Sequence, residues 1–217
     1  LESLNRYNIQ RTLQYAARGY EDVVDIDSMA EAVLNSVYDG ISTKDLSKVM
    51  IMVARSYIER DPGYSYVAAQ LLLSMQYREV IGKDLDYSRL EECYRQAFVT
   101  NLREGVSKGL LSEELLSFNL EWVASQLKPE RDNIFKFLGI QTLYDRYFIK
   151  DPVEKRMFET PQAFWMRVAM GLALAEPVEQ REQRALEFYE IMSPLYFIPS
   201  TPTLFHSGTL HPQLSSC

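Results

Sequence analysis

The sequence predicts a mainly α-helical protein, and three observations support this prediction. Apolar side chains recur at three- and four-residue spacing over most of the 217 residues. Glycine or proline stands where each such segment is expected to end. A composition of 47% hydrophobic and 24% charged residues is that of a chain that folds around a core rather than a disordered one.

Residues 1–82 are expected to form a compact unit of four helices. The first carries Ile9 and Leu13 on one face and ends near the glycine of "RGYED". The second covers "DSMAEAVLNSVYDG", in which Ser28 and Glu31 have the spacing of a capping box and the Asp-Gly pair marks the end.

The third helix of this unit is predicted to begin after Ser42, with Asp45 at capping distance. Pro62 and the glycine after it end this helix. A fourth helix, "YSYVAAQLLLSMQYREVIG", then continues to Gly82.

The middle of the chain contains the helical pattern "YSRLEECYRQAFVTNLREGV", in which Leu90, Tyr94 and Phe98 recur at four-residue spacing. Cys93 lies inside this pattern and is interpreted as a buried or half-buried structural thiol. For "NIFKFLGIQTLYDRYFIKD" we expect a helix followed by a short hairpin or strand.

Two further helices precede the end of the chain. "ETPQAFWMRVAMGLALAE" begins with Thr160 as N-cap and Pro161 at the first helical position, and a buried apolar stripe should follow. "EQREQRALEFYEIMSPL" is closed by Pro194. The two prolines of "YFIPSTPTLF" then predict an extended chain, suited only to a strand edge or a loop.

Charge and cysteine content exclude several classes of protein. A formal net charge of -7 argues against binding a nucleic-acid backbone, which requires a basic surface. The most apolar window, "FWMRVAMGLALA", is too short for a membrane span and contains Arg167. Two cysteines cannot form a disulfide framework, and the N-terminal residues do not resemble a signal peptide, so a cytoplasmic location is expected.

The last 17 residues, "TPTLFHSGTLHPQLSSC", carry the candidate chemistry. They are rich in hydroxyl groups, and a glycine among them would let the backbone approach a ligand closely. Cys217 could be a redox or nucleophilic thiol, although spacing alone also fits a plain loop. His206 and His211 lack the spacing of a metal pair, so surface histidines are favoured over a zinc site or a Cys/His dyad.

This ending closely resembles the segment "TPTLFN(S/A)GT…PQLSSC" of the large catalytic subunit of class I ribonucleotide reductase. Four upstream segments resemble that family in the same order: "YDGI", "IERDPGYSYVAAQLL", "GIQTLYDRYF" and "ETPQAFWMRVAMGLAL". The resemblance therefore covers essentially the whole chain, but only the front part of the family's protein. The ten-stranded α/β barrel of the family would lie almost wholly beyond Cys217.

The resemblance implies three domains: an incomplete ATP-cone-like four-helix unit (1–82), the helical N-terminal domain (83–195) and the first extended strand of the barrel (196–217). It implies that Cys217 is one of two redox-active thiols that reduce the 2′-carbon of a ribonucleoside diphosphate and end as a disulfide. Its partner cysteine would lie outside this chain. Thr201 and Ser216 match positions that contact the substrate, near the diphosphate and near the sugar.

The resemblance also implies partners and effectors. The complete enzyme would need the rest of the large subunit as a homodimer, a small radical-generating subunit with a metal centre, and thioredoxin or glutaredoxin; alone, this segment should be inactive.

ATP, dATP and other dNTPs would be allosteric effectors. Thr43 matches a position near the nucleotide, but the chain starts at "LESLNRY", without the β-hairpin that normally opens the cone, and Asn8 stands where a lysine is expected. A non-catalytic helical domain kept for regulation or assembly is the alternative.

Overall fold

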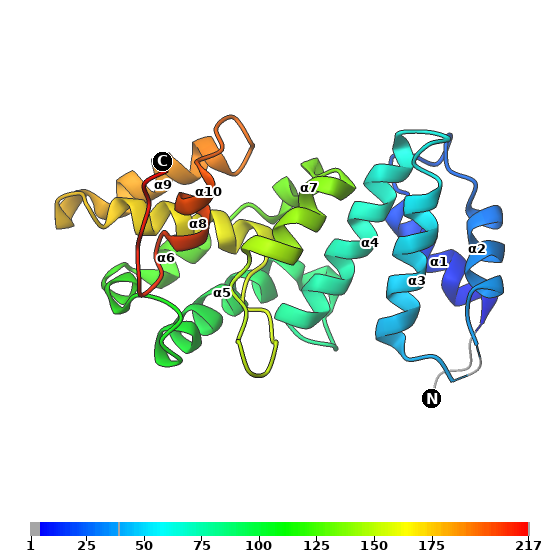
Figure 1. Ribbon diagram of the computed structural model, residues 1–217, viewed down its shortest axis with the longest axis horizontal. Helices are drawn as coiled ribbons and strands as arrows, with labels where there is room; N and C mark the ends of the chain where they lie inside the picture. Colours follow the sequence, from blue (N-terminus) through cyan, green and yellow to red (C-terminus); the bar gives the residue numbers. More distant parts are fainter. Residues whose placement is uncertain (1–4, 39, 217) are drawn as a thin grey trace. The chain divides into compact units, whose positions relative to one another are not determined.

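A computed structural model describes residues 5–38 and 40–216, and these residues form helices, with no strand among them (Figure 1). The mainly helical fold predicted from the sequence is confirmed. The chain divides into two compact units. The first comprises Leu1–Gln76 and Phe135–Thr142, and the second comprises Tyr77–Ile134 and Leu143–Cys217. The expected assignment of the first 82 residues to a regulatory cone stays a prediction.

The first unit is built from α1 (Arg6–Ala16), α2 (Ile26–Asn35), α3 (Thr43–Ser56), most of α4 (Gly63–Val80) and the short α7 (Phe137–Thr142). Its core contains fully buried apolar side chains from the first three helices, including Leu13, Met29 and Ala54. The backbone N–H of Phe137 donates to Oγ of Ser65, 3.2 Å away, and so holds α7 against α4.

The starts of α2 and α3 differ in how well the sequence predicts them. Ser42 caps α3 as expected, because its Oγ accepts from the backbone N–H of Asp45 at 3.0 Å. The prediction for α2 was wrong: Asp25, not Ser28, is the N-cap, and its carboxylate accepts from both N–H and Oγ of Ser28. An ionised side chain accepts two such bonds at once, which a hydroxyl cap does less well.

The second unit surrounds α8 (Pro161–Ala173), which α9 (Arg181–Met192) accompanies along its length (Figure 1). The other α-helices of this unit are α5 (Leu90–Ser107), α6 (Leu120–Ser125) and α10 (Thr201–His206). Short 3₁₀ turns cover Tyr87–Arg89, Glu113–Ser117, Pro129–Ile134 and Val178–Gln180, and a π turn covers Leu143–Tyr147. Thr160 and Pro161 stand at the N-cap and first position of α8 as predicted, and every residue from Pro161 to Met170 is buried. The helix is therefore enclosed on nearly all sides, not only along one stripe.

A buried polar cluster joins five elements in this core. The carboxylate of Asp132 accepts from the hydroxyls of Tyr77 and Tyr94, at 2.6 and 2.9 Å, and from Nε2 of Gln162 at 2.7 Å. Gln162 in turn accepts from the hydroxyl of Tyr189 at 2.7 Å. Burial raises the pKa of the Asp132 carboxyl to about 7, although these hydrogen bonds act to lower it.

Three further expectations have definite outcomes. Cys93 is half-buried in α5, as expected. A hairpin-like turn follows the π turn, where Lys150 and Met157 form an isolated antiparallel bridge. The extended chain predicted for "YFIPSTPTLF" was partly wrong, because Thr201–His206 is helical. Pro202 lies in the first turn of α10, where its missing N–H breaks no helical hydrogen bond.

The barrel strand expected over residues 196–217 is not formed in the described part of that range, which contains α10 and one isolated bridge between Leu111 and Thr209. A strand needs a neighbouring strand to satisfy its backbone groups, and residue 111 offers a single pairing. Among the helices of the described residues, none combines the length and the apolar character of a membrane span.

Candidate functional site

The C-terminal segment, defined here as residues 200–216, holds two of the predicted site residues. Thr201 is the first residue of α10 and is exposed, with Oγ1 3.3 Å from the hydroxyl of Tyr147. Ser216 is exposed in the irregular run after α10. Cys217, the predicted redox thiol, lies outside the described residues.

Thr203 ties the two halves of the C-terminal segment together. Its hydroxyl donates to the carbonyl of Leu214 at 3.1 Å and lies 3.1 Å from Oγ of Ser200. Because Thr201 lies two residues before Thr203 and Ser216 two residues after Leu214, this bond brings both predicted substrate contacts to one side of the second unit.

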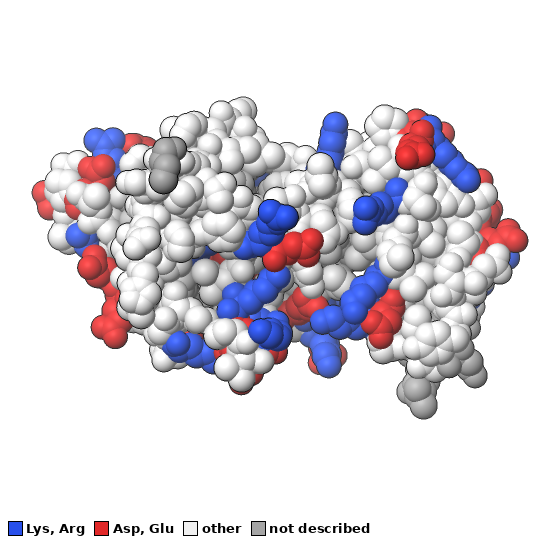
Figure 2. All heavy atoms as spheres, viewed as in Figure 1, with Lys and Arg blue, Asp and Glu red and all other residues white. Residues whose placement is uncertain are grey.

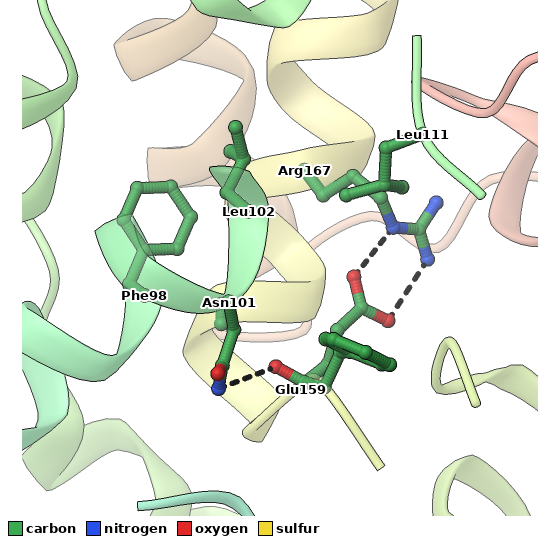
Figure 3. Close-up of a pocket in the computed structure, with 8 residues that line it drawn as sticks. Phe98, Asn101, Leu102, Leu111, Glu159 and Arg167 are labelled. Carbon is green, nitrogen blue, oxygen red and sulfur yellow. Dashed lines mark hydrogen bonds and ion pairs between the residues drawn. The ribbon is translucent and has the colours of Figure 1, made fainter. Parts of the chain in front are cut away.

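Arg167 of α8 binds the C-terminal end of α10. The residue is 1% exposed, and its Nη1 donates to the carbonyl of Ser207 at 2.6 Å and to that of Leu204 at 3.5 Å. The last carbonyls of a helix lack partners inside the helix, and a cation is well suited to them. Nε of Arg167 donates to Glu159 at 2.5 Å, so the buried charge is paired (Figure 3).

Glycines allow the C-terminal segment to lie directly on α8. A Cβ atom on Gly171 would collide with the backbone nitrogen of Gly208 and would stand 2.7 Å from its Cα. Gly208 itself has φ of 75°, a conformation that favours glycine. Oγ of Ser207 donates to the carbonyl of Val168 at 2.8 Å, and the carbonyl of Gly208 accepts from the N–H of Ser112 at 3.0 Å.

Aromatic packing fixes the exposed side of α10. The ring of Phe205 stacks on that of Tyr147 with centroids 4.5 Å apart, and Tyr147 also meets the buried ring of Phe164 edge-on. The same tyrosine that contacts Thr201 is therefore held in place from two sides.

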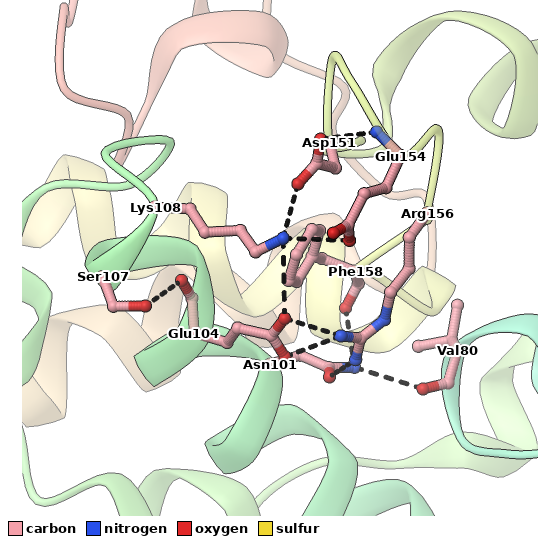
Figure 4. Close-up of polar contacts among 9 residues, drawn as sticks. All are labelled: Val80, Asn101, Glu104, Ser107, Lys108, Asp151, Glu154, Arg156 and Phe158. Atoms are coloured by element: carbon pink, nitrogen blue, oxygen red, sulfur yellow. Dashed lines mark hydrogen bonds and ion pairs between the residues drawn. The ribbon is translucent and has the colours of Figure 1, made fainter.

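Three cations of the second unit, Arg167, Lys108 and Arg156, are each paired with carboxylates. Beside Arg167, a cavity of about 20 Å³ lined by Phe98, Asn101 and Glu159 among others has room for one water molecule (Figure 3). At the C-terminal end of α5, Nζ of Lys108 lies 2.6 Å from Asp151 and 3.0 Å from Glu154 (Figure 4). Lys108 and backbone N–H groups lower the pKa of Asp151 to about 2, so this carboxylate is ionised under ordinary conditions.

The second cation of that cluster, Arg156, contacts both carboxylate oxygens of Glu104 at 2.6 and 2.7 Å and Oδ1 of Asn101 at 2.9 Å (Figure 4). It fastens the loop of residues 149–158 to α5. Neither Lys108 nor Arg156 is thus available for a substrate phosphate without breaking these contacts.

The chemistry that the C-terminal segment offers is consequently that of neutral donors. No Lys, Arg, Asp or Glu occurs in residues 191–217. Hydroxyls and backbone N–H groups can bind an anionic phosphate without a cation. His206 and His211 are exposed, as expected for surface histidines, and the described residues contain no cluster of His, Cys, Asp and Glu suited to a metal ion.

Sequence reasoning missed the residues that position this segment. Arg167 was noted only as a charge that argues against a membrane span. A lone arginine within the apolar run "FWMRVAMG", eight residues after a glutamate, is a signal for a buried ion pair that could have found it. No periodic pattern in the sequence predicts that Gly171 and Gly208 are in contact.

The remaining predicted site residue, Thr43, belongs to the first unit. It is the first residue of α3, directly after the Ser42 cap, and it is exposed. A role in binding ATP stays a prediction.

Comparison with known proteins identifies relatives over the whole chain. The family model described as the all-alpha domain of ribonucleotide reductase matches residues 134–212. The chain is 40% identical to the ribonucleoside-diphosphate reductase subunit alpha of Chlamydia muridarum over 205 residues, which are 94% of this chain and 19% of that protein. For the alpha subunit of Helicobacter pylori (strain 26695) the identity is 36%, over 100% of this chain and 26% of that protein.

A phage protein of the same name agrees: the alpha subunit of enterobacteria phage T4 is 29% identical over 100% of this chain and 28% of its own length. The chain thus spans about a fifth to a quarter of the length of these relatives. Over its whole length the chain thus matches the N-terminal part of the ribonucleotide reductase large subunit.

Proposed function

We propose that this chain supplies the substrate-binding entrance and one redox thiol of a ribonucleoside-diphosphate reductase, which makes deoxyribonucleotide precursors for DNA synthesis. The observation that carries the proposal is the similarity to named alpha subunits over essentially the whole chain, at 36–40% identity. Assembly with the rest of the large subunit is part of the proposal, because the chain spans only a fifth to a quarter of those relatives.

In the proposed reaction, Cys217 and a second cysteine outside this chain deliver two electrons. The 2′-hydroxyl of the ribose leaves as water, C2′ gains a hydrogen, and the two thiols become one disulfide. A radical supplied by the small subunit, which carries a metal centre, initiates the reaction. Thioredoxin or glutaredoxin then reduces the disulfide by thiol exchange.

The positions of the neutral donors are consistent with this role. Thr201 stands at the exposed start of α10, and Ser216 lies in the run that Thr203 holds beside that helix. The hydroxyl of Thr201 would bind the diphosphate, and Ser216 would lie near the sugar. Arg167, Lys108 and Arg156 are paired with carboxylates, so the proposal assigns phosphate binding to these neutral groups.

The experiment that tests this function combines the chain with the remainder of the large subunit, the small subunit, thioredoxin and a ribonucleoside diphosphate. Replacing Cys217 by serine should abolish turnover driven by thioredoxin while the assembly still forms. Cys93→Ser is the matched control, because this half-buried thiol lies in α5, and it should leave turnover unchanged.

Undiminished turnover with Cys217→Ser would contradict the proposal. It would favour the alternative, a non-catalytic helical domain kept for regulation or assembly. Thr201→Val provides an independent check, since loss of a phosphate-binding hydroxyl should raise KM more than it lowers kcat.

Regulation by nucleotides is a further part of the proposal. The complete enzyme, as a homodimer in the cytoplasm, would respond to ATP, dATP and other dNTPs. The first unit would bind ATP near Thr43 if it keeps the function of a cone. Titration of the chain with ATP in a calorimeter, with Thr43→Val alongside, tests this binding directly.

A further inference from the structure

An apolar patch lies on the loop between α9 and α10. It consists of three consecutive side chains, Tyr196, Phe197 and Ile198, which are 85%, 58% and 57% exposed, together with Ile191 at the end of α9, which is 48% exposed. Single exposed apolar residues are common on proteins, but four that lie together on one loop and the adjacent helix end are typical of an interaction surface.

The backbone presents this patch in a fixed way. Leu195, directly before it, has φ of 64°, a left-handed conformation that residues other than glycine rarely adopt. This turn directs the chain away from the axis of α9, and the N–H of Phe197 donates to the carbonyl of Ile191 at 3.2 Å. A hydrogen-bonded turn thus fixes the backbone of the loop that carries these three exposed side chains (Figure 1, loop between α9 and α10).

The chain that follows Ile191 lacks charge, and the two charged residues that most closely precede it in α9, Glu187 and Glu190, are paired with Arg184 and with Lys128 and Arg131. Residues 191–217 contain no Lys, Arg, Asp or Glu, although charged residues make up 24% of the sequence. In Figure 2 the surface at the α9–α10 loop carries no charged side chain. Depletion of charge together with exposed tyrosine and phenylalanine is the compositional signature of the centre of a protein interface.

The same absence of charge argues against other occupants. A membrane surface or a nucleic acid would be bound through Lys or Arg near the apolar side chains, and this segment has neither. The relatives of this chain, by contrast, are about four to five times as long as the part that the chain covers. The patch also adjoins α10, which begins at Thr201 and carries the proposed substrate contact.

We propose that the apolar patch of Tyr196, Phe197, Ile198 and Ile191 is the surface on which the remainder of the large subunit docks. The partner would present a charge-poor apolar face. This inference rests on the proposed function for the identity of the partner. It goes further in naming the residues that join the two parts and in placing that joint next to the start of α10.

The test measures binding of this chain to the remainder of the large subunit from the same organism, produced as a separate polypeptide. The triple variant Tyr196→Ser, Phe197→Ser and Ile198→Ser should raise Kd at least roughly tenfold, because three large apolar side chains would no longer be buried. The matched control is Val153→Ser with Val178→Ser, which removes two apolar side chains that are 86% and 70% exposed in the same unit. It should leave Kd unchanged.

Unchanged affinity in the triple variant would overturn the proposal. So would sedimentation that shows the chain forming a dimer through the patch, because the occupant would then be a second copy. Since all three replaced side chains are exposed, circular dichroism and the melting temperature should be the same for the variant and the parent.

Failure of the proposed function gives a different result. If the triple variant loses binding but Cys217→Ser in the assembled enzyme keeps full turnover, the docking surface stands and the redox role fails. If Cys217→Ser abolishes turnover while the triple variant assembles normally, the redox role stands and the docking surface fails.

Discussion

Gly171 of α8 and Gly208 of the C-terminal segment touch so closely that neither a methyl group nor a larger side chain fits at position 171. The obstacle is backbone, which cannot rotate away as a flexible side chain would. The contact lets Ser207 reach the carbonyl of Val168. The C-terminal segment, which carries Thr201, can therefore pack on α8 only because position 171 has no side chain.

Gly171→Ala should therefore destabilise the protein although alanine is the better helix former. Overpacking a close contact costs about 1–3 kcal/mol, which exceeds the helix gain of about 1 kcal/mol. Gly139→Ala in α7 is the matched control, because its Cβ would meet only the side chain of Phe135 at 3.4 Å. Urea unfolding should show a lower midpoint for Gly171→Ala alone; equal midpoints would contradict the close contact.

Removing one partner of the buried pair between Arg167 and Glu159 should be severe. Glu159 is only 5% exposed, and Arg167→Met removes the cation that pairs with it. An unpaired buried charge of this kind typically lowers the free energy of unfolding by about 3–5 kcal/mol. Adding Glu159→Gln to the same chain should restore part of this loss. Arg184→Gln, which breaks the exposed pair with Glu187, is the control and should cost less than about 1 kcal/mol.

The free energy of unfolding of the two single variants and the double variant is the measurement for this pair. If Arg167→Met costs no more than Arg184→Gln, the buried pair does not anchor the segment. Limited proteolysis after α10 gives a second readout, because loss of the Arg167 contacts to Leu204 and Ser207 should expose that segment to cleavage.

The helices of this protein are largely visible in its sequence, whereas the contacts that build the site are not. Local signals act within one turn: the stripe with Leu13 and the cap at Ser42 depend only on neighbours a few residues away. The cap of α2 was misplaced because Asp25 and Ser28 are both good capping residues at compatible spacing, and the sequence alone does not rank them.

The start of α10 shows a different limit. Two prolines in "YFIPSTPTLF" disfavour a long helix, but Pro202 fits the first turn of a short one. The contact of Arg167 with Ser207 spans 40 residues, and the Asp132 cluster draws on residues from positions 77 to 189. No local pattern encodes such distances, so only the presence of a polar residue in an apolar run indicates them.

The Asp132 carboxyl should make stability depend on pH. Its pKa is about 7 in the folded protein and near 4 in an unfolded chain. Between these values the folded state binds a proton that the unfolded state does not, so stability from this group is greatest at low pH and falls as pH rises towards 7. Unfolding by urea at several pH values from 4.5 to 8 measures this slope.

Asp132→Asn removes the titrating group and should flatten that slope. Asp151→Asn is the comparison with the opposite sign: the pKa of Asp151 is lowered to about 2, so its contribution is present above pH 4 and is lost as pH falls towards 2. An Asp132→Asn variant that keeps the slope of the parent between pH 4.5 and 7 would show that another group is responsible.

Tyr147 should act on Thr201 through its ring more than through its hydroxyl. The ring stacks on Phe205 at 4.5 Å, whereas the contact between the hydroxyl and Oγ1 of Thr201, at 3.3 Å, is long and exposed. Tyr147→Phe should therefore leave the free energy of unfolding nearly unchanged. In the assembled reductase it should change KM by less than twofold. Tyr147→Leu should lower stability by about 1 kcal/mol and raise KM, because α10 loses its aromatic support. Equal KM values for the two variants would mean that the stack does not position Thr201.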